Sequence, residues 1–129
     1  MGKVSSLPKE QLIVNNSTIL VENVVKGIQE KKGHDIAILD LKPTGNALAD
    51  FFIITHAESS TQVDAIAKSV EDEVEKHTGE KPVFKEGYTN AEWILLDYID
   101  VVVHIFMKEQ RDFYGIERLW ADAAITKIK

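Results

Sequence analysis

The stretch that decides the fold of this chain is WILLDYIDVVVHIF, residues 93–106. It has the pattern of a two-stranded β-hairpin, and its faces follow if the turn is centred on Ile99 and Asp100, although the sequence does not fix the register. Alternation gives the hairpin one almost wholly aliphatic face and one face with polar and aromatic members. The first face receives Ile94, Leu96, Tyr98, Val101, Val103 and Ile105, and the second receives Trp93, Leu95, Asp97, Val102, His104 and Phe106.

The polar face of this hairpin permits two interpretations. A buried Asp97 needs partners to offset several kcal/mol of desolvation, so the face is either polar at an open rim or sealed around satisfied side chains. In the first interpretation it is a working surface. In the second, Asp97 and His104 satisfy each other beneath a helix, and Trp93 is an ordinary core residue. The residues alone leave both interpretations open.

Three segments outside the hairpin carry the spacing of amphipathic helices. The first spans residues 17–33 and ends at a glycine cap, Gly33. The second spans residues 59–79, where the side chains of Ser59 and Gln62 are spaced to cap each other's backbone N–H. The third is a short helix after residue 107. The apolar stripes are Val63, Ile66, Ala67, Val70 and Val74 in the second helix, and Ile116, Leu119, Trp120 and Ala123 in the third.

Strands are predicted at residues 35–41, at residues 49–57, in a short segment after Pro82, and in the two arms of the hairpin. The continuous apolar run from Phe51 to Ile54 indicates a central strand covered on both faces. The order α, β, β, α, β, β, β, α predicts an α/β or α+β domain, a mixed five-stranded sheet flanked by helices. Strands separated by a helix are expected to pair in parallel, and the hairpin is antiparallel.

Length and composition limit what the chain can be. Its 129 residues suit a single domain at residues 17–125, with a poorly ordered leader at 1–16 and a tail at 126–129. The absence of cysteine excludes disulfides and thiolate metal sites and fits the cytoplasm. No apolar run is long enough to span a bilayer. The net charge of −6 disfavours nucleic acid and favours a basic protein partner.

Catalytic chemistry has little support in the residues. Asp40, Asp50, Asp97 and Asp100 could hold Mg²⁺ for nucleotidyl transfer, because hard cations prefer carboxylate oxygens. The chain lacks, however, the Gly-Ser loop and D-x-D pair that such enzymes use. The histidines have no metal-ligand spacing. We therefore predict no catalytic residue, no metal and no cofactor. The histidines are His34, His56, His77 and His104.

Three segments carry a family resemblance: ADFFIITHAESSTQVDAIAKSV, EGYTNAEWILLDYIDVVVHIF and RDFYGIERLWADA. In this order they resemble the ribosomal silencing factor family, also called the Iojap family, over about residues 17–123. The family's E-G word falls on residues 86–87, its W-x-x-x-D word on residues 93–97, and its D-V-V-V-H word on residues 100–104. The chain departs from the pattern at Ile99, where the family usually has glycine, and at His56 and Ala57, where it usually has Thr-Gly. Both departures are expected to affect turns.

The resemblance implies a non-enzymatic factor that binds the large ribosomal subunit through ribosomal protein uL14. Such a factor sterically blocks joining of the small subunit and represses translation. The fold it implies has a nucleotidyltransferase-like topology, and fold likeness alone does not transfer activity. The alternative is a metal-dependent nucleotidyltransferase-like enzyme that uses Asp97 and Asp100. The family resemblance implies these partner-binding residues: Glu86, Trp93, Asp97, Tyr98, Asp100 and Phe106.

Two further expectations concern binding partners. We expect no membrane contact and no direct sequence-specific binding of nucleic acid. An exposed aromatic sheet face also invites a two-fold contact, so the free protein is predicted to form a homodimer through the same surface.

Overall fold

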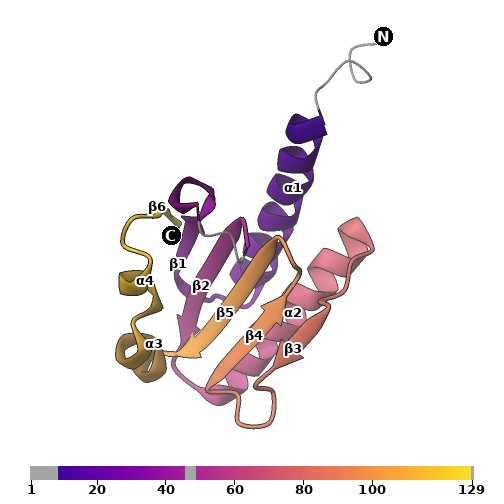
Figure 1. Ribbon diagram of the computed structural model, residues 1–129. Coiled ribbons are helices and arrows are strands. Elements are labelled where there is room, and N and C mark those ends of the chain that lie inside the picture. The colour runs from indigo at the N-terminus through magenta and orange to yellow at the C-terminus, as the bar shows by residue number, and fades with distance from the viewer. Residues whose placement is uncertain (1–8, 46–48, 129) are drawn as a thin grey trace.

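The computed structural model describes residues 9–45 and 49–128. They form a six-stranded sheet in the order β3-β4-β5-β2-β1-β6, with helices on both faces (Figure 1). The strands are β1 (His34–Asp40), β2 (Phe51–Ala57), β3 (Phe84–Glu86), β4 (Trp93–Asp97), β5 (Val101–Met107) and β6 (Ala124–Ile128). The helices are α1 (Lys9–Glu30), α2 (Ser60–Thr78), α3 (Lys108–Tyr114) and α4 (Ile116–Leu119), with a short 3₁₀ helix η2 (Lys42–Thr44).

The sheet is mixed, as predicted, and belongs to an α+β domain. Strands β2 and β5 pair in parallel across the α2 connection, and all other neighbours pair antiparallel. Strand β2 is central and buried along almost its whole length, which confirms the interpretation of its apolar run. The predicted number of five strands was wrong. Strand β6 pairs with β1 at the edge of the sheet, where the sequence predicted the start of a tail.

Helix α1 begins earlier than predicted. The helix starts at Lys9, so residues 9–16 of the predicted leader are helical, whereas residues 1–8 lie outside the described residues. At the C-terminal end of α1, the residue with the left-handed backbone conformation is Lys32, with φ of 59°, and not the predicted cap Gly33. Gly33 is required for space, because a Cβ there would collide with Ile28 and approach Thr55 Oγ1 to 2.8 Å. The division into leader, domain and tail stays a prediction.

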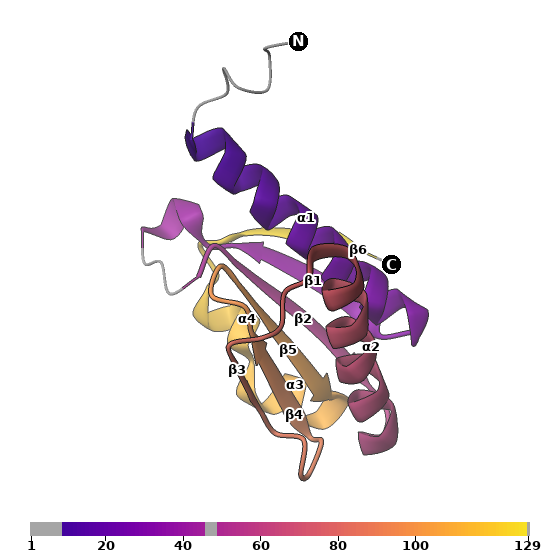
Figure 2. The same ribbon diagram turned by 90° about the vertical axis from the view of Figure 1, so that its right-hand side faces the viewer.

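Helix α2 confirms most of its sequence prediction. Its whole apolar stripe is buried, and the Ser59 hydroxyl accepts the backbone N–H of Gln62 at 3.2 Å. The predicted return bond, from the Gln62 side chain to the backbone of Ser59, does not form. Gln62 Nε2 donates instead to the carbonyl oxygens of Lys31, at 3.2 Å, and Lys32. This bond ties the start of α2 to the end of α1. The two helices lie side by side over one face of the sheet (Figure 2).

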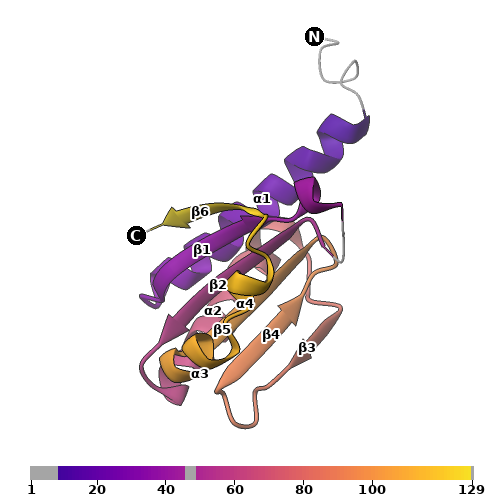
Figure 3. The same ribbon diagram turned by 60° about the vertical axis from the view of Figure 1, so that its left-hand side comes forward.

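The opposite face of the sheet is only partly covered. The predicted third helix is broken at Gly115, which has φ of 55°, into α3 and α4. Ile116 is buried and Trp120 half-buried, but Leu119 is 75% exposed, so it is not a core residue. Helices α3 and α4 lie over β2 and β5 and leave β3 and β4 uncovered (Figure 3). Within the described ranges, no helix is long and apolar enough to cross a membrane.

Candidate functional site

The central hairpin has the register that follows from a turn centred on Ile99 and Asp100, a register that the sequence alone left open. Strand β4 pairs with β5 so that Trp93 lies opposite Phe106 and Asp97 opposite Val102. The aliphatic set packs in one core cluster with α1 and α2. The other set faces the partly covered side of the sheet. Residues 99 and 100 form the turn, closed by the Tyr98 backbone N–H donating to the Val101 carbonyl at 2.9 Å.

Strand β3 extends the uncovered side. Phe84 lies directly opposite Asp97, and Glu86 lies opposite Leu95, so their side chains share the face that carries Trp93. Phe84 is 51% exposed, Glu86 is exposed, and the three β4 residues are partly buried. We call the surface formed by Phe84, Glu86, Trp93, Leu95 and Asp97 the open face. It is a stretch of sheet without a covering helix (Figure 3).

Trp93 is neither sealed in the core nor free in solvent. Its ring stacks on Phe106 and contacts Tyr114, with centroid separations of 4.8 Å in both cases. Its indole Nε1–H donates to His104 Nδ1 at 3.2 Å. The indole is therefore held in one orientation, with part of its surface left exposed on the open face.

His104 is a core residue. Its side chain is buried, and burial lowers its pKa to about 4, so the ring is neutral near pH 7 and accepts the indole N–H of Trp93. The alternative in which Asp97 and His104 satisfy each other is wrong. Asp97 Oδ1 instead accepts the backbone N–H of Ile99 at 2.8 Å and stabilises the hairpin turn.

The six residues predicted for partner binding fall into three positions. Glu86, Trp93 and Asp97 lie on the open face. Asp100 is exposed in the turn that follows β4, at the end of the strand remote from Trp93. Strand β4 itself spans about 14 Å from Trp93 to Asp97. The remaining two are buried: Tyr98 is 4% exposed on the side of α1 and α2, and Phe106 is 1% exposed beneath the Trp93 ring. Neither of these two side chains therefore reaches the surface of the protein.

Two cavities flank Trp93 on the open face. One of about 370 Å³ is bounded by the β3–β4 loop and α3, and one of about 270 Å³ lies between Glu86, Gly87, Trp93 and Leu95. Sequence reasoning missed three residues here. Phe84 alternates with Glu86 along β3 and could have been assigned to the same face, whereas Glu92 and Tyr114 carried no signal, since only folding brings Tyr114 to Trp93.

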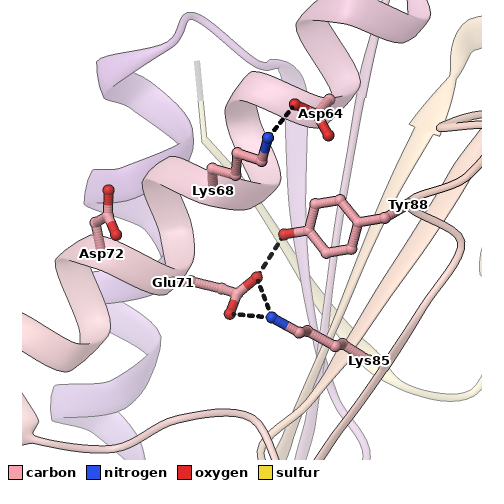
Figure 4. A pocket seen from close by; sticks show the side chains of 6 residues that line it. All are labelled: Asp64, Lys68, Glu71, Asp72, Lys85 and Tyr88. Atoms are coloured by element: carbon pink, nitrogen blue, oxygen red, sulfur yellow. Dashed lines mark hydrogen bonds and ion pairs between the residues drawn. The ribbon is translucent and has the colours of Figure 1, made fainter.

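A larger cavity, of about 560 Å³, lies on the other side of β3, against α2 (Figure 4). Its charges are largely paired within the protein. Glu71 accepts the Tyr88 hydroxyl at 2.5 Å and Lys85 Nζ at 3.1 Å, and Lys68 pairs with Asp64 at 3.1 Å. Burial and the nearby Glu71 carboxylate raise the pKa of Tyr88. This network braces β3 and its following turn against α2 and leaves no unpaired cation in the cavity for an anionic ligand.

Arg111 fixes α3 and α4 to the sheet. The side chain is 8% exposed, and its Nη2 and Nε donate to the Glu117 carboxylate at 2.8 and 3.2 Å. Its Nη1 donates to the Asp35 carbonyl at 2.8 Å and lies 2.9 Å from His56 Nδ1. Burial, followed by the Arg111 charge, lowers the pKa of His56 and outweighs the opposite effect of Asp35. The neutral His56 ring therefore accepts this bond.

Three of the four aspartates proposed for a metal site are engaged separately, and the fourth, Asp100, is exposed in the hairpin turn. Asp40 pairs with Lys42 at 3.2 Å, Asp50 accepts the Ser17 hydroxyl at 3.5 Å, and Asp97 binds the hairpin turn. Among the side chains that the structure describes, in residues 17–45 and 49–128, no group of three or more His, Asp or Glu is placed to hold a metal ion.

Comparison with known proteins identifies the family. The family model described as "Ribosomal silencing factor during starvation" matches residues 14–129. The chain belongs to the ribosomal silencing factor family. Its silencing-factor relatives include those of Bacillus subtilis, 34% identical over 88% of this chain and 94% of the relative, and Halalkalibacterium halodurans, 37% identical over 85% and 92%. The chloroplastic Iojap protein of Arabidopsis thaliana is 37% identical over 78% of this chain and 41% of its own length.

Two solved structures share the fold. A crystal structure from Chromobacterium violaceum is 35% identical, has a TM-score of 0.76, and covers 81% of this chain and 85% of its own. One from Bacillus halodurans is 36% identical, with a TM-score of 0.71, and covers 87% and 98%. Silencing factors of this family are ribosome-binding proteins rather than enzymes, so the prediction that the chain is not an enzyme is confirmed.

The Ile99 departure from the silencing-factor pattern is visible in the backbone. Ile99 has φ of 77°, in the left-handed region that glycine adopts without steric cost. A β-branched residue is an outlier there. The hairpin turn thus keeps the conformation that the family's usual glycine would favour, and isoleucine is strained in it.

Proposed function

We propose that this protein silences ribosomes by docking its open face on ribosomal protein uL14 of the large subunit, where it sterically blocks the small subunit and represses translation. The proposal requires no chemistry, since an interface of standard size on a rigid sheet is enough to hold the factor in place. It places the protein in the cytoplasm with the ribosomes. If the fold has the nucleotidyltransferase-like topology that the family resemblance implies, that topology would support the open face and would not provide an active site.

The observation that carries the proposal is the stretch of sheet left uncovered beside α3 and α4. Its centre is Trp93, oriented by His104 and flanked by two cavities. Tryptophan in such a setting is a favoured anchor at protein interfaces. Glu86 on the face and Asp100 at its end form no ion pair with any described residue, so both charges are available to a basic partner.

The test is co-sedimentation with purified large subunits, combined with a subunit-joining assay by light scattering. Glu86→Lys reverses an exposed charge on the open face, and we expect binding to weaken about tenfold or more, because it sets like charges against each other. Asp72→Lys makes the same charge change on exposed α2 and serves as the matched control. Equal binding by both variants, or a wild-type protein that binds without slowing subunit joining, contradicts the proposal.

We further propose that the free protein forms a homodimer through the same face, which the dimer would conceal. Phe84 and Trp93 supply the exposed apolar surface for such a contact. Sedimentation equilibrium of the wild type and of Phe84→Ser tests this. Because Phe84 is half exposed, the substitution should disrupt association without unfolding the chain. A variant that dimerises as well as the wild type contradicts the shared surface.

A further inference from the structure

The larger cavity beside Trp93 has aromatic and acidic walls. It measures about 370 Å³, within the range of pockets that hold small ligands. The rings of Trp93 and Tyr114 meet there with their planes tilted by 44°. The other residues that line it come from the end of β3, the loop after it, and α3: Glu86, Gly87, Thr89, Asn90, Glu92 and Gln110.

The chemistry of the cavity selects a cation. No lysine, arginine or histidine lines it, whereas Glu86 and Glu92 do, and neither forms an ion pair with a described residue. Lys85, the basic residue next to Glu86 in sequence, points to the other side of the sheet and is held by Glu71. Gln110 adds an amide oxygen that accepts no hydrogen bond within the described part of the chain. The pocket is therefore rich in acceptors that lack donors.

The backbone around the pocket is already in place. Gly87 has φ of 100°, and a Cβ there would collide with the Trp93 carbonyl oxygen, so only glycine lets the loop close against β4. On the far side of the loop, Tyr88 is fixed by its hydrogen bond to Glu71 (Figure 4). The position of the Glu86 and Glu92 backbone thus does not depend on a bound ligand.

We propose that this cavity binds one arginine side chain of the docking partner. A flat guanidinium stacks on aromatic rings and donates five hydrogen bonds in a fork that matches carboxylates, which a lysine ammonium does not. This inference rests on the proposed function, because it names the part of the partner that the open face holds. The proposal assigns Tyr114 and Glu92 to the interface. Neither residue belongs to the three motif words at residues 86–87, 93–97 and 100–104.

The first test uses the isolated protein and no ribosome. N-acetyl-arginine amide is titrated while the indole N–H signal of Trp93 is followed by NMR, with Trp120→Phe used to assign it. We expect a saturable shift in the millimolar range, and about tenfold weaker binding to Glu92→Gln. The neutral analogue N-acetyl-citrulline amide should give no saturable shift. An equal response to citrulline or to N-acetyl-lysine amide, or no response to arginine, overturns the proposal.

The second test returns to large subunits. We expect Glu92→Gln and Tyr114→Leu to weaken co-sedimentation about tenfold each, Tyr114→Phe to retain it, and Glu109→Gln, an exposed acid on the same helix, to behave as wild type. If the wild type binds and the two pocket variants bind equally well, the arginine pocket is refuted and the proposed function stands. If the wild type itself does not bind, the proposed function fails, and the titration alone decides on the pocket.

Discussion

Replacing Arg111 by alanine tests how the uncovered sheet and the helices beside it are held together. The substitution removes the guanidinium that bridges Glu117 on α4, the Asp35 carbonyl at the start of β1, and His56 on β2. All of these acceptors then lose a donor in a region where water does not replace it fully. Glu117 is the most affected, because its pKa is lowered chiefly by the hydrogen bond from Arg111.

The expected cost follows from the burial of the pair. Removing one partner of a buried ion pair costs about 3–5 kcal/mol, and we take about 3 because the Glu117 side chain is 25% exposed. Unfolding entropy of about 2.1 cal/mol/K per residue over 129 residues gives about 0.27 kcal/mol/K. The midpoint of thermal unfolding should therefore fall by about 11 °C. Because Tyr114 is carried by α3, we also expect weaker binding of large subunits.

Differential scanning calorimetry and urea unfolding measure this loss, and a double-mutant cycle separates its causes. Arg111→Ala with Glu117→Ala removes both charges and should lose less than the sum of the single variants, since no carboxylate is left without its partner. Lys108→Ala removes an exposed ion pair with Asp112 in the same helix and should leave the midpoint unchanged. A loss below about 1 kcal/mol for Arg111→Ala would refute the reasoning.

Three further predictions concern the hairpin and its brace. The pKa of His104 is about 4 in the folded protein against an ordinary 6.5. The free energy of unfolding should therefore be greatest above about pH 6.5 and fall by about 3 kcal/mol as the pH drops toward 4. In urea unfolding across this range, His104→Gln should show a smaller dependence of that free energy on pH. Ile99→Gly should raise the free energy of unfolding by about 1 kcal/mol by relieving the left-handed strain, and an unchanged urea midpoint would contradict that. Tyr88→Phe should lose about 1 kcal/mol in the same assay, because Glu71 keeps Lys85 but loses the hydroxyl; a loss as large as that of Arg111→Ala would point to a wider disruption.

The sequence predicted correctly those features that depend on local periodicity. Alternation over residues 93–106 placed every hairpin residue on its observed face, since a shift of one residue would have exposed the whole aliphatic set. The cap at Ser59 and the stripe from Val63 to Val74 located α2 in the same way. These signals need only neighbours in the chain, so no tertiary information was required.

The features that it missed depend on contacts between distant segments. Strand β6 has mostly exposed residues and pairs with β1 from the far end of the chain, so its alternation is too weak to be recognised. The contact of Tyr114 with Trp93 exists only because Gly115 ends α3 and Arg111 fixes that helix to β1 and β2. Tyr98 and Phe106, two of the predicted partner-binding residues, are buried by contacts that the hairpin sequence alone does not show.

The arrangement of charge separates the two sides of the domain in a way that favours docking over catalysis. On α2, four of the five carboxylates are paired with bases within reach, and Asp72 is not: the pairs are Asp64 with Lys68, Glu71 with Lys85, Glu73 with His77, and Glu75 with Lys81. Glu86 and Glu92, which flank Trp93, have no such partner among the described residues. Acids without partners around an oriented indole match a surface whose counter-charges arrive on another protein.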